Sequence, residues 1–303
     1  MKALSTRLLP YISVAIVSGY ATANTKTPEI MVVTGTKTER ALLDTPVRTE
    51  VITEVDLERN HARSLEEALR FVPGVQLVDR HGKGGKEVIL QGVDGQRVLV
   101  LVDGLPTSPT SGTATDVSKI AVAGVKQIEI VKGAVSALYG SNAMGGVINI
   151  ITKRPFNKSN EFKLTLDAGT YGEHNVRDFP INDGHANLYA LYSEDNWYLQ
   201  FVGDSRNMGG VDLDKGTFNF EDYAGSRSNI SLTAGLRTSD TGLVEIKPTL
   251  YQEDIYRHYE TFSPGVGEKQ MSKVEKSTRY DLSVRYEDQF ADDVLLSAYY
   301  MLM

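Results

Sequence analysis

Residues 230–236 read Ile-Ser-Leu-Thr-Ala-Gly-Leu, so apolar residues alternate with small or polar ones. Successive side chains of a β-strand point to opposite faces, and this alternation therefore predicts a strand with one apolar face. Six further stretches of similar length show the same period: 162–168, 186–192, 197–203, 244–250, 280–286 and 294–302. A series of such strands is typical of an outer-membrane β-barrel.

Two further features favour a barrel over a soluble β-sandwich, which would also alternate. Of the 15 Tyr, 9 Phe and 1 Trp, all but four follow residue 155, as expected for aromatic girdles at the membrane interfaces. The predicted connections are uneven, because 289–293 is a short turn whereas 204–227 and 251–277 are long loops. We therefore predict an antiparallel transmembrane β-barrel over residues 155–303.

The first residues have the order of a secretory signal peptide. Lys2 and Arg7 are basic, residues 8–19 are uncharged and mostly apolar, and Ala21-Thr22-Ala23 has the small-x-small form that signal peptidase reads. A membrane anchor is the less favoured alternative, because a spanning helix needs about 20 apolar residues. We expect residues 1–23 to be cleaved and the mature protein to reach the outer membrane of a Gram-negative bacterium.

The composition argues against several classes of function. The 303 residues carry a net charge of −7, which does not suit a nucleic-acid partner. The absence of cysteine excludes disulfides, Fe–S clusters and thiolate zinc sites. The five histidines are dispersed, no nucleophile elbow occurs, and the basic stretch 82–86 lacks the spacing of a phosphate loop. We expect no enzymatic activity, no metal site and no cofactor.

The segment before the alternating strands mixes short strands with helices. A strand is predicted at 46–55, and a helix begins at Ser64, where Ser64-Leu65-Glu66-Glu67 predicts a capping box, and ends at Pro73-Gly74. Further strands are predicted at 75–78, 88–90, 98–102, 125–131 and 147–152. The strand at 98–102 is apolar throughout, so both of its faces should be buried. This pattern predicts a small α+β domain.

A β-branched run, Glu29-Ile30-Met31-Val32-Val33-Thr34, precedes this domain in a polar setting. With no neighbouring run to pair with, it could add as a strand to the sheet edge of another protein. The alternative is an ordinary first strand of the domain, which the residue types alone favour.

Five stretches of the α+β segment form a recognisable set: 64–75 (SLEEALRFVPGV), 97–104 (RVLVLVDG), 128–133 (IEIVKG), 136–140 (SALYG) and 145–152 (GGVINIIT). Together they resemble the plug domain of the TonB-dependent outer-membrane receptors. The resemblance implies a signal peptide (1–23), a TonB box with its linker (24–40), a plug domain (41–154) and the N-terminal part of the barrel (155–303).

The resemblance also implies partners and a mechanism. Residues 29–34 resemble a TonB box, which now favours the edge-adding role: TonB, energised in the inner membrane, captures this strand and displaces part of the plug, so that a substrate bound outside can pass. The substrate would be a ferric siderophore or haem. The alternatives are cobalamin or another nutrient, and a plug-containing envelope protein that does not transport.

Site residues follow from the same resemblance. The plug loops that would face the substrate contain Arg80, His81, Lys83, Lys86, Asp94, Gln96, Thr107 and Ser108. The basic residues among them suit an anionic ferric chelate. The family latches its plug to the barrel wall through two arginines, which are Gln91 and Lys132 here. Because lysine lacks the bidentate fork of arginine, we expect a weaker or differently built latch.

The number of predicted strands falls short of a closed barrel. Barrels of this family have about 22 strands, and about seven are predicted here. An open edge in lipid would leave backbone groups unsatisfied. We therefore expect the chain to be the N-terminal part of a longer receptor, either a fragment or the product of a truncated gene.

Overall fold

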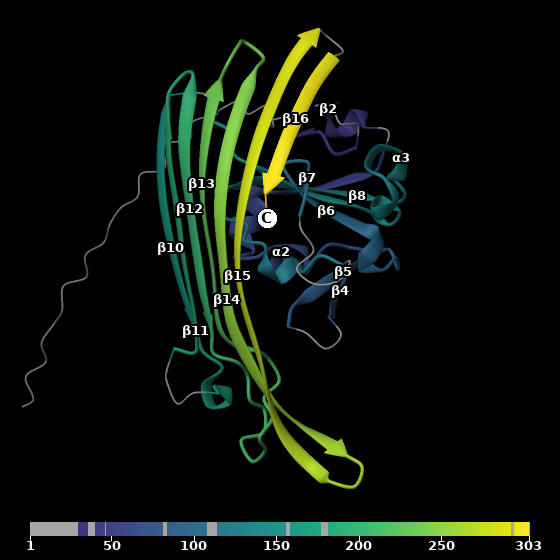
Figure 1. The fold of residues 1–303 in the computed structure, drawn as a ribbon, viewed down its shortest axis with the longest axis vertical. Coiled ribbons are helices and arrows are strands. Elements are labelled where there is room, and N and C mark those ends of the chain that lie inside the picture. Colours follow the sequence, from purple (N-terminus) through teal and green to yellow (C-terminus); the bar gives the residue numbers. More distant parts are fainter. Residues whose placement is uncertain are drawn as a thin grey trace, which may run out of the picture.

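The computed structural model describes residues 30–35, 40–45, 47–80, 84–107, 114–155, 158–176, 181–291 and 294–302. The predicted signal peptide, Glu29, His81, Lys83 and Ser108 lie outside these ranges. Figure 1 shows a small mixed domain and a tall curved sheet that wraps around one side of it. Within the described ranges, no helix is long and apolar enough to cross a membrane.

The mixed domain, which we call the plug, is built on a five-stranded sheet in the order β3-β8-β9-β6-β7. Its strands are β3 (Thr49–Thr53), β8 (Val125–Lys132), β9 (Gly146–Thr152), β6 (Val98–Val102) and β7 (Leu105–Pro106). Strands β6 and β9 run parallel, and the other neighbours are antiparallel. Two further antiparallel pairs join β4 (Val75–Asp79) to β5 (Lys86–Leu90) and β1 (Met31–Val32) to β2 (Arg40–Ala41). The α+β prediction is confirmed.

Short helices connect these strands. They are α1 (Glu54–Arg59), α2 (Leu65–Leu69) and α3 (Ser136–Tyr139), with 3-10 turns η1 (Leu42–Asp44), η2 (Gly95–Arg97), η3 (Val117–Lys119), η4 (Ser141–Ala143) and η5 (Gly172–His174). Helix α2 begins as predicted, because the Ser64 hydroxyl accepts a bond from the Glu67 amide. The predicted capping box is only half formed, since the Glu67 carboxylate accepts from the Arg63 amide instead.

The plug has its own hydrophobic core. Leu65 and Leu69 of α2 are fully buried in the same cluster as Ile128, Ile130 and Ile148 of the sheet. Strand β6 has three buried residues and two half-buried ones, so the prediction that both of its faces are covered is largely confirmed. This core holds the sheet rigid enough to position the polar groups described below.

The curved sheet, which we call the wall, contains seven antiparallel strands in sequence order. They are β10 (Ser159–Gly169), β11 (Asp183–Ser193), β12 (Trp197–Met208), β13 (Ala224–Arg237), β14 (Leu243–Ser263), β15 (Gly267–Ala291) and β16 (Val294–Leu302). All seven predicted strands are present. In the described part of the chain the sheet is open, with β10 and β16 as its edges.

The two faces of the wall have opposite character. On the outer face Phe162, Leu164 and Leu166 of β10 are 56–73% exposed. On the inner face, which meets the plug, Gln200 and Thr233 are buried. A soluble sandwich would bury its apolar face and expose its polar one, whereas a membrane barrel does the reverse. The wall therefore has the pattern of a barrel.

The prediction of a long loop at 251–277 is wrong. Strands β14 and β15 stay paired as far as Ser263 opposite Gly267, and they form a hairpin that extends well beyond the other strands (Figure 1). The many charged residues of this hairpin leave no alternation of apolar residues in the sequence. Its strands pair nevertheless, because pairing through backbone hydrogen bonds does not require apolar side chains. The other predicted loop is real but shorter, because β12 ends at Met208 and β13 begins at Ala224.

Candidate functional site

The N-terminal segment, residues 30–34, lies on the plug rather than free. Met31 and Val32 pair with Ala41 and Arg40, and the Leu42 amide donates to the Ile30 carbonyl. The expectation that this run lacks a local partner is therefore wrong for the described residues. Sequence reasoning missed the pairing because β2 has only two residues and no periodicity.

A buried carboxylate of the plug sheet binds this segment. Glu129 of β8 is 1% exposed, and it accepts hydrogen bonds from the Val33 amide at 3.0 Å and from the Thr34 amide at 2.7 Å. Gln127, two residues earlier, donates through its side-chain amide to Glu129 at 2.7 Å and to the Met31 carbonyl at 2.8 Å. Side chains of β8 therefore bind both backbone N–H groups and a backbone carbonyl of the segment.

Thr34, which is fully buried, is held by two more side chains. The Asn149 amide donates to the Thr34 hydroxyl at 3.0 Å, and the Tyr139 hydroxyl donates to the Thr34 carbonyl at 3.0 Å. Burial raises the pKa of Tyr139 to about 12, so its hydroxyl keeps its proton near neutral pH. We call Gln127, Glu129, Asn149 and Tyr139 the cradle.

The β4–β5 loop, one of the predicted substrate-facing loops, lies toward the opposite end of the plug. In Figure 1, β2 lies near the turn between β15 and β16, whereas the β4–β5 hairpin lies toward the end where the long β14–β15 hairpin projects. Arg80 is only 9% exposed, and its guanidinium lies 3.9 Å from the Asp116 carboxylate. Lys86 forms an ion pair with Asp79. The side chain of Arg80 is thus buried against Asp116, and its role toward a substrate stays a prediction.

The remaining predicted loop residues have local roles. Asp94 caps η2 by accepting from the Gln96 amide at 3.1 Å, and both side chains are exposed. The Thr107 hydroxyl donates to the Val100 carbonyl at 3.1 Å and is half-buried. Of the predicted loop residues that the structure describes, Asp94 and Gln96 are thus the exposed ones, whereas Lys86 is half-buried at the start of β5.

The two residues at the predicted latch positions, Gln91 and Lys132, bond to groups of the plug. Lys132 bonds to Glu50 and to the Pro73 carbonyl, both within the plug, and its side chain is 4% exposed. Gln91 is exposed at a turn with φ +50°, where its amide donates to Gly74. These hydrogen bonds of both residues lie within the plug, and their part in a latch stays a prediction.

Other residues join the plug to the wall. The Lys119 ammonium lies 2.6 Å from the Glu253 carboxylate of β14, and Arg227 of β13 lies 2.7 Å from the same carboxylate. Arg227 also donates to the Ser118 hydroxyl, and Arg206 of β12 donates to the Ser118 carbonyl. All of these charged side chains are at most 11% exposed. We call this set the η3 anchor.

A second group of contacts lies where the chain leaves the plug. Arg154 pairs with Glu245 at 3.2 Å and with Glu287 at 3.1 Å, and Arg285 donates to the Asp103 carbonyl. Sequence reasoning missed both groups. One signal in the sequence could have indicated them. Charged residues within the alternating strands have to lie on the polar, inward face, because positions exposed to lipid disfavour charge.

Lys119→Met is expected to lower the free energy of unfolding by about 2 kcal/mol, because a charge-assisted bond across the interface is lost while Arg227 still partners Glu253. The measurement is urea unfolding of the receptor in outer-membrane vesicles, combined with Glu253→Gln in a double-mutant cycle. Lys126→Met, at an exposed plug position, is the matched control. A coupling energy near zero would show that the two charges do not stabilise the interface.

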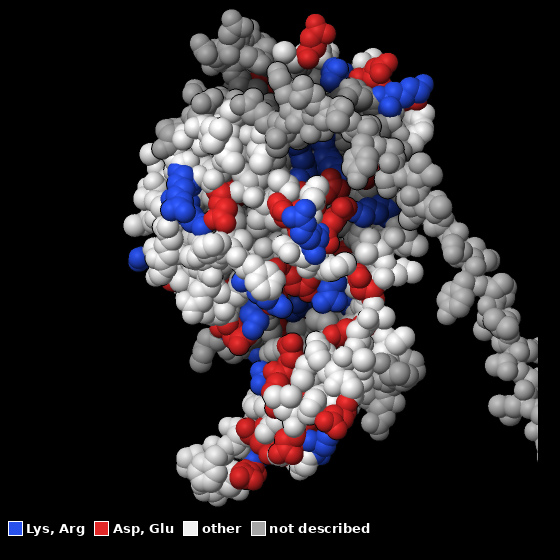
Figure 2. All heavy atoms as spheres, turned by 180° about the vertical axis from the view of Figure 1, so that it is seen from behind, with Lys and Arg blue, Asp and Glu red and all other residues white. Residues whose placement is uncertain are grey.

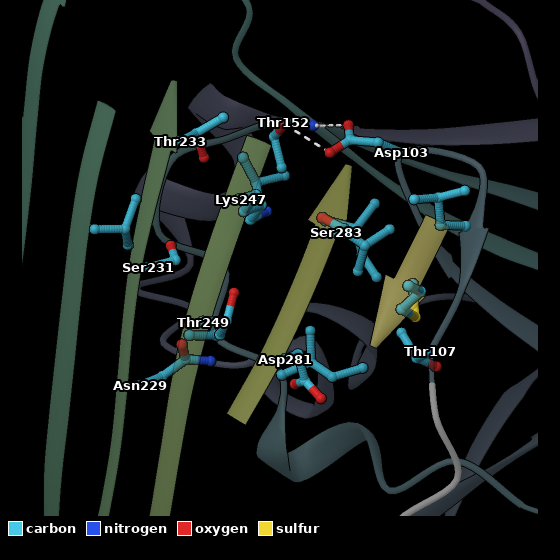
Figure 3. Close-up of a pocket in the computed structure, with 18 of the residues that line it drawn as sticks. Asp103, Thr107, Thr152, Asn229, Ser231, Thr233, Lys247, Thr249, Asp281 and Ser283 are labelled. Atoms are coloured by element: carbon cyan, nitrogen blue, oxygen red, sulfur yellow. Dashed lines mark hydrogen bonds between the residues drawn. The ribbon is translucent and has the colours of Figure 1, made fainter. Parts of the chain in front are cut away.

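A cavity of about 210 Å³ lies between the plug and the inner face of the wall. Figure 3 shows Asp103, Thr107 and Thr152 on the plug side, with the Asp103 carboxylate bonded to Thr152. The wall side is formed largely by small polar and charged residues of three strands: Asn229, Ser231, Thr233, Lys247, Thr249, Asp281 and Ser283. Figure 2 shows acidic and basic side chains mixed along the middle of the molecule and on the long hairpin.

Comparisons with known proteins agree with this architecture. A family model described as the TonB-dependent receptor plug domain matches residues 41–147. The chain is 38% identical over 169 residues to the vitamin B12 transporter BtuB of Vibrio cholerae serotype O1, which covers 55% of this chain and 27% of that protein. The chain thus spans about a quarter of the length of the curated relatives that it matches.

Solved structures share the fold at low sequence identity. The ferric enterobactin receptor PfeA of Pseudomonas aeruginosa matches with a TM-score of 0.61 at 18% identity, over 84% of this chain and 40% of that one. FpvA of P. aeruginosa matches with a TM-score of 0.65 at 16% identity, over 88% of this chain and 35% of that one. Residues 41–147 thus carry the plug domain of the TonB-dependent receptors, and the wall that follows is an unclosed antiparallel sheet of the fold seen in these solved structures.

Proposed function

We propose that this chain forms the plug and part of the wall of an outer-membrane receptor for energy-coupled nutrient uptake. One observation carries the proposal: the plug is seated on the polar inner face of a wall whose outer face is apolar. Such a wall suits lipid outside and a polar passage inside. The plug blocks that passage, so transport requires the plug to move.

The energy would enter through the N-terminal segment. Residues 29–34 act as a TonB box, whose backbone adds to the edge of a TonB sheet. Strand β2, which pairs with the segment, and the β4–β5 loop lie toward opposite ends of the plug (Figure 1), which supports a receptor that binds outside and is pulled from inside. The proposed division of the chain is a signal peptide (1–23), the box and linker (24–40), the plug (41–154) and the wall (155–303).

Cobalamin is the first candidate substrate. The curated relatives at 38% identity are named vitamin B12 transporters. The structure also weakens the case for an anionic ligand at the β4–β5 loop, because Arg80 and Lys86 already have carboxylate partners in the plug. A ferric siderophore or haem is the second candidate, supported by the further basic residues His81 and Lys83 of the same loop.

Deletion of the gene is expected to abolish saturable uptake of radiolabelled cobalamin at nanomolar concentrations and to leave growth on ferric siderophores and haem unchanged. Restoring the gene should restore uptake only in cells that contain TonB. Loss of iron acquisition with normal cobalamin uptake would replace the first candidate by the second. Normal uptake of all these substrates would instead identify a plug-containing envelope protein that does not transport them.

A further inference from the structure

The cavity between plug and wall has a defined place on the inner face of the wall (Figure 3). Inward-facing residues of β14 follow one another in steps of two, because successive side chains of a strand alternate between its faces. Glu245 pairs with Arg154 at one end of this series, and Glu253 pairs with Lys119 nearer the long hairpin. Lys247 lies between them and lines the cavity. Two charged contacts therefore bound the cavity along β14.

Two charged side chains of the lining can each take a further partner. Lys247 is half-buried, and among the residues that the structure describes it has no carboxylate within ion-pair distance. The Asp281 carboxylate of β15 accepts from Arg279 through Oδ2 at 2.8 Å, but its buried Oδ1 accepts no hydrogen bond from any described residue. A buried polar atom without a partner is costly. The cavity therefore favours an occupant that satisfies both groups.

The two side chains are placed so that one ligand can reach both. Lys247 lies opposite Ser283, and Asp281 lies opposite Thr249, in the β14–β15 register. Lys247 and Asp281 are thus diagonal neighbours on one face of the wall, which separates them by roughly 7–8 Å. The described structure has no ion pair between them. A small polar molecule that enters the cavity can bridge this distance.

The rest of the lining defines the chemistry of such a molecule. Short hydroxyl side chains of three neighbouring strands face the cavity: Ser231 and Thr233 of β13, Thr249 of β14 and Ser283 of β15. Hydroxyls both donate and accept, so they suit hydroxyl or amide groups. The remaining charged residues of the lining have partners, such as Asp103 with Thr152 and Arg285 with Glu287. The lining thus fits one anionic group beside Lys247 and disfavours a multiply charged ligand.

The wall is also less tightly paired beside the cavity. The pairing of β13 with β14 is interrupted between Ser231–Thr249 and Ala234–Ile246. Pro248 lies in this interval and has no backbone N–H to donate to a neighbouring strand. The strands that carry the hydroxyl groups are therefore joined by fewer hydrogen bonds here, which allows the lining to adjust to a ligand.

We propose that this cavity is a binding site for a ligand surface that carries hydroxyl or amide groups and one anionic group, held between Lys247 and Asp281. The proposal rests on the proposed function in one respect, that the ligand is a nutrient on its way past the plug. Cobalamin has this chemistry, because it carries several amide side chains and one phosphodiester. A ferric chelate with several negative charges does not, since Lys247 would meet only one of them.

A single-cysteine reporter tests occupancy of the cavity, because the chain contains no cysteine. Ser283→Cys places a thiol on the half-buried inner face of β15, in the receptor in outer-membrane vesicles. The thiol is labelled with methyl methanethiosulfonate, and the probe is glycerol 3-phosphate, which has two hydroxyls and one phosphate. Probe at a few times its Kd should slow labelling about 5-fold, because bound ligand covers the thiol.

Lys247→Met tests whether the anionic group binds where we propose. The probe concentration that gives half-protection should rise about 10-fold, because a charge-assisted bond to the phosphate is lost. Lys247→Arg should retain protection, and glycerol without phosphate should protect less. Equal labelling of Ser283→Cys with and without the probe would overturn the site. Equal protection in Lys247→Met would overturn it as well.

Thr165→Cys is the matched control for the reporter. Thr165 is a half-buried, inward residue of β10, and it lines a second cavity of about 310 Å³ between the plug and β10–β12. The ammonium groups of that cavity already have partners, since Lys153 pairs with Glu54 and Lys163 with Glu58. Labelling there should not respond to the probe. Equal slowing at both positions would mean that the probe acts on the receptor as a whole, which would overturn the site.

Uptake of radiolabelled cobalamin by energised cells separates this proposal from the proposed function. Protection by the probe, with lower uptake but normal binding on ice in Lys247→Met, supports both. Protection with no cobalamin uptake by the unmodified receptor supports the site and removes cobalamin as the nutrient. Uptake by the unmodified receptor with no protection removes the site and leaves the proposed function standing. Normal uptake by Lys247→Met overturns the role of the site in the passage of the nutrient.

Discussion

Val32→Pro is expected to abolish uptake while substrate binding to whole cells stays normal. Proline has no backbone N–H, so it interrupts the ladder that an added strand must form. Val32 lies in the middle of the proposed box, two residues after Ile30 and two before Thr34. The loss should be complete rather than partial, because force on the plug requires the whole strand to be held. The measurement compares binding of labelled substrate on ice with accumulation in energised cells.

Val32→Ala is the matched control for this experiment. It also removes side-chain atoms from a buried position but keeps the backbone N–H, so energised uptake should remain measurable. Normal uptake by Val32→Pro would show that residues 29–34 are not captured as a strand. Loss of both binding and uptake would point instead to a plug that no longer folds, and the amount of folded receptor in the membrane therefore has to be measured alongside.

Leu232→Arg is expected to destabilise the wall by about 2–4 kcal/mol, the range for a basic residue on the lipid face near the middle of a bilayer. Leu232 lies near the middle of β13, is 45% exposed on the outer face, and is flanked by the buried inward residues Ser231 and Thr233. The measurements are urea unfolding in vesicles and the fraction of receptor that shows heat-modifiable migration on a gel.

The control for the lipid face is Leu213→Arg. Leu213 is 61% exposed in the connection between β12 and β13, outside the strands of the wall. The same substitution there should change stability by about 0.5 kcal/mol or less, as for an ordinary surface position. Equal effects at the two positions would mean that the outer face of β13 does not meet lipid.

Much of the wall could be predicted from the sequence, because alternation is a local signal. The stretch 230–236 falls inside β13 and shows the expected two faces. The hairpin at 251–277 was missed because its charged side chains carry no apolar period, although the strands are paired to the tip. Pairing there depends on two strands meeting in water, which a pattern of apolar residues along the sequence does not reveal.

The candidate site was predicted less well, because its residues act through partners far away in the chain. The stretch 128–133 was identified as a strand, but nothing in it indicates that Glu129 is buried against a segment 96 residues earlier. Lys132 was expected to face the wall and instead bonds to Glu50 and Pro73. One of the contacts that do join plug and wall, Lys119 with Glu253, spans 134 residues.

The sequence by itself determined the fold class and the direction of the side chains in the alternating stretches of the wall, because strand geometry sends neighbouring residues to opposite faces. Only the tertiary structure decided which charges meet, whether Arg80 faces solvent or Asp116, and whether residues 31–34 are free or docked. The physical reason is that a buried charge is retained only with partners in contact. Here those partners come from distant segments that folding alone brings together.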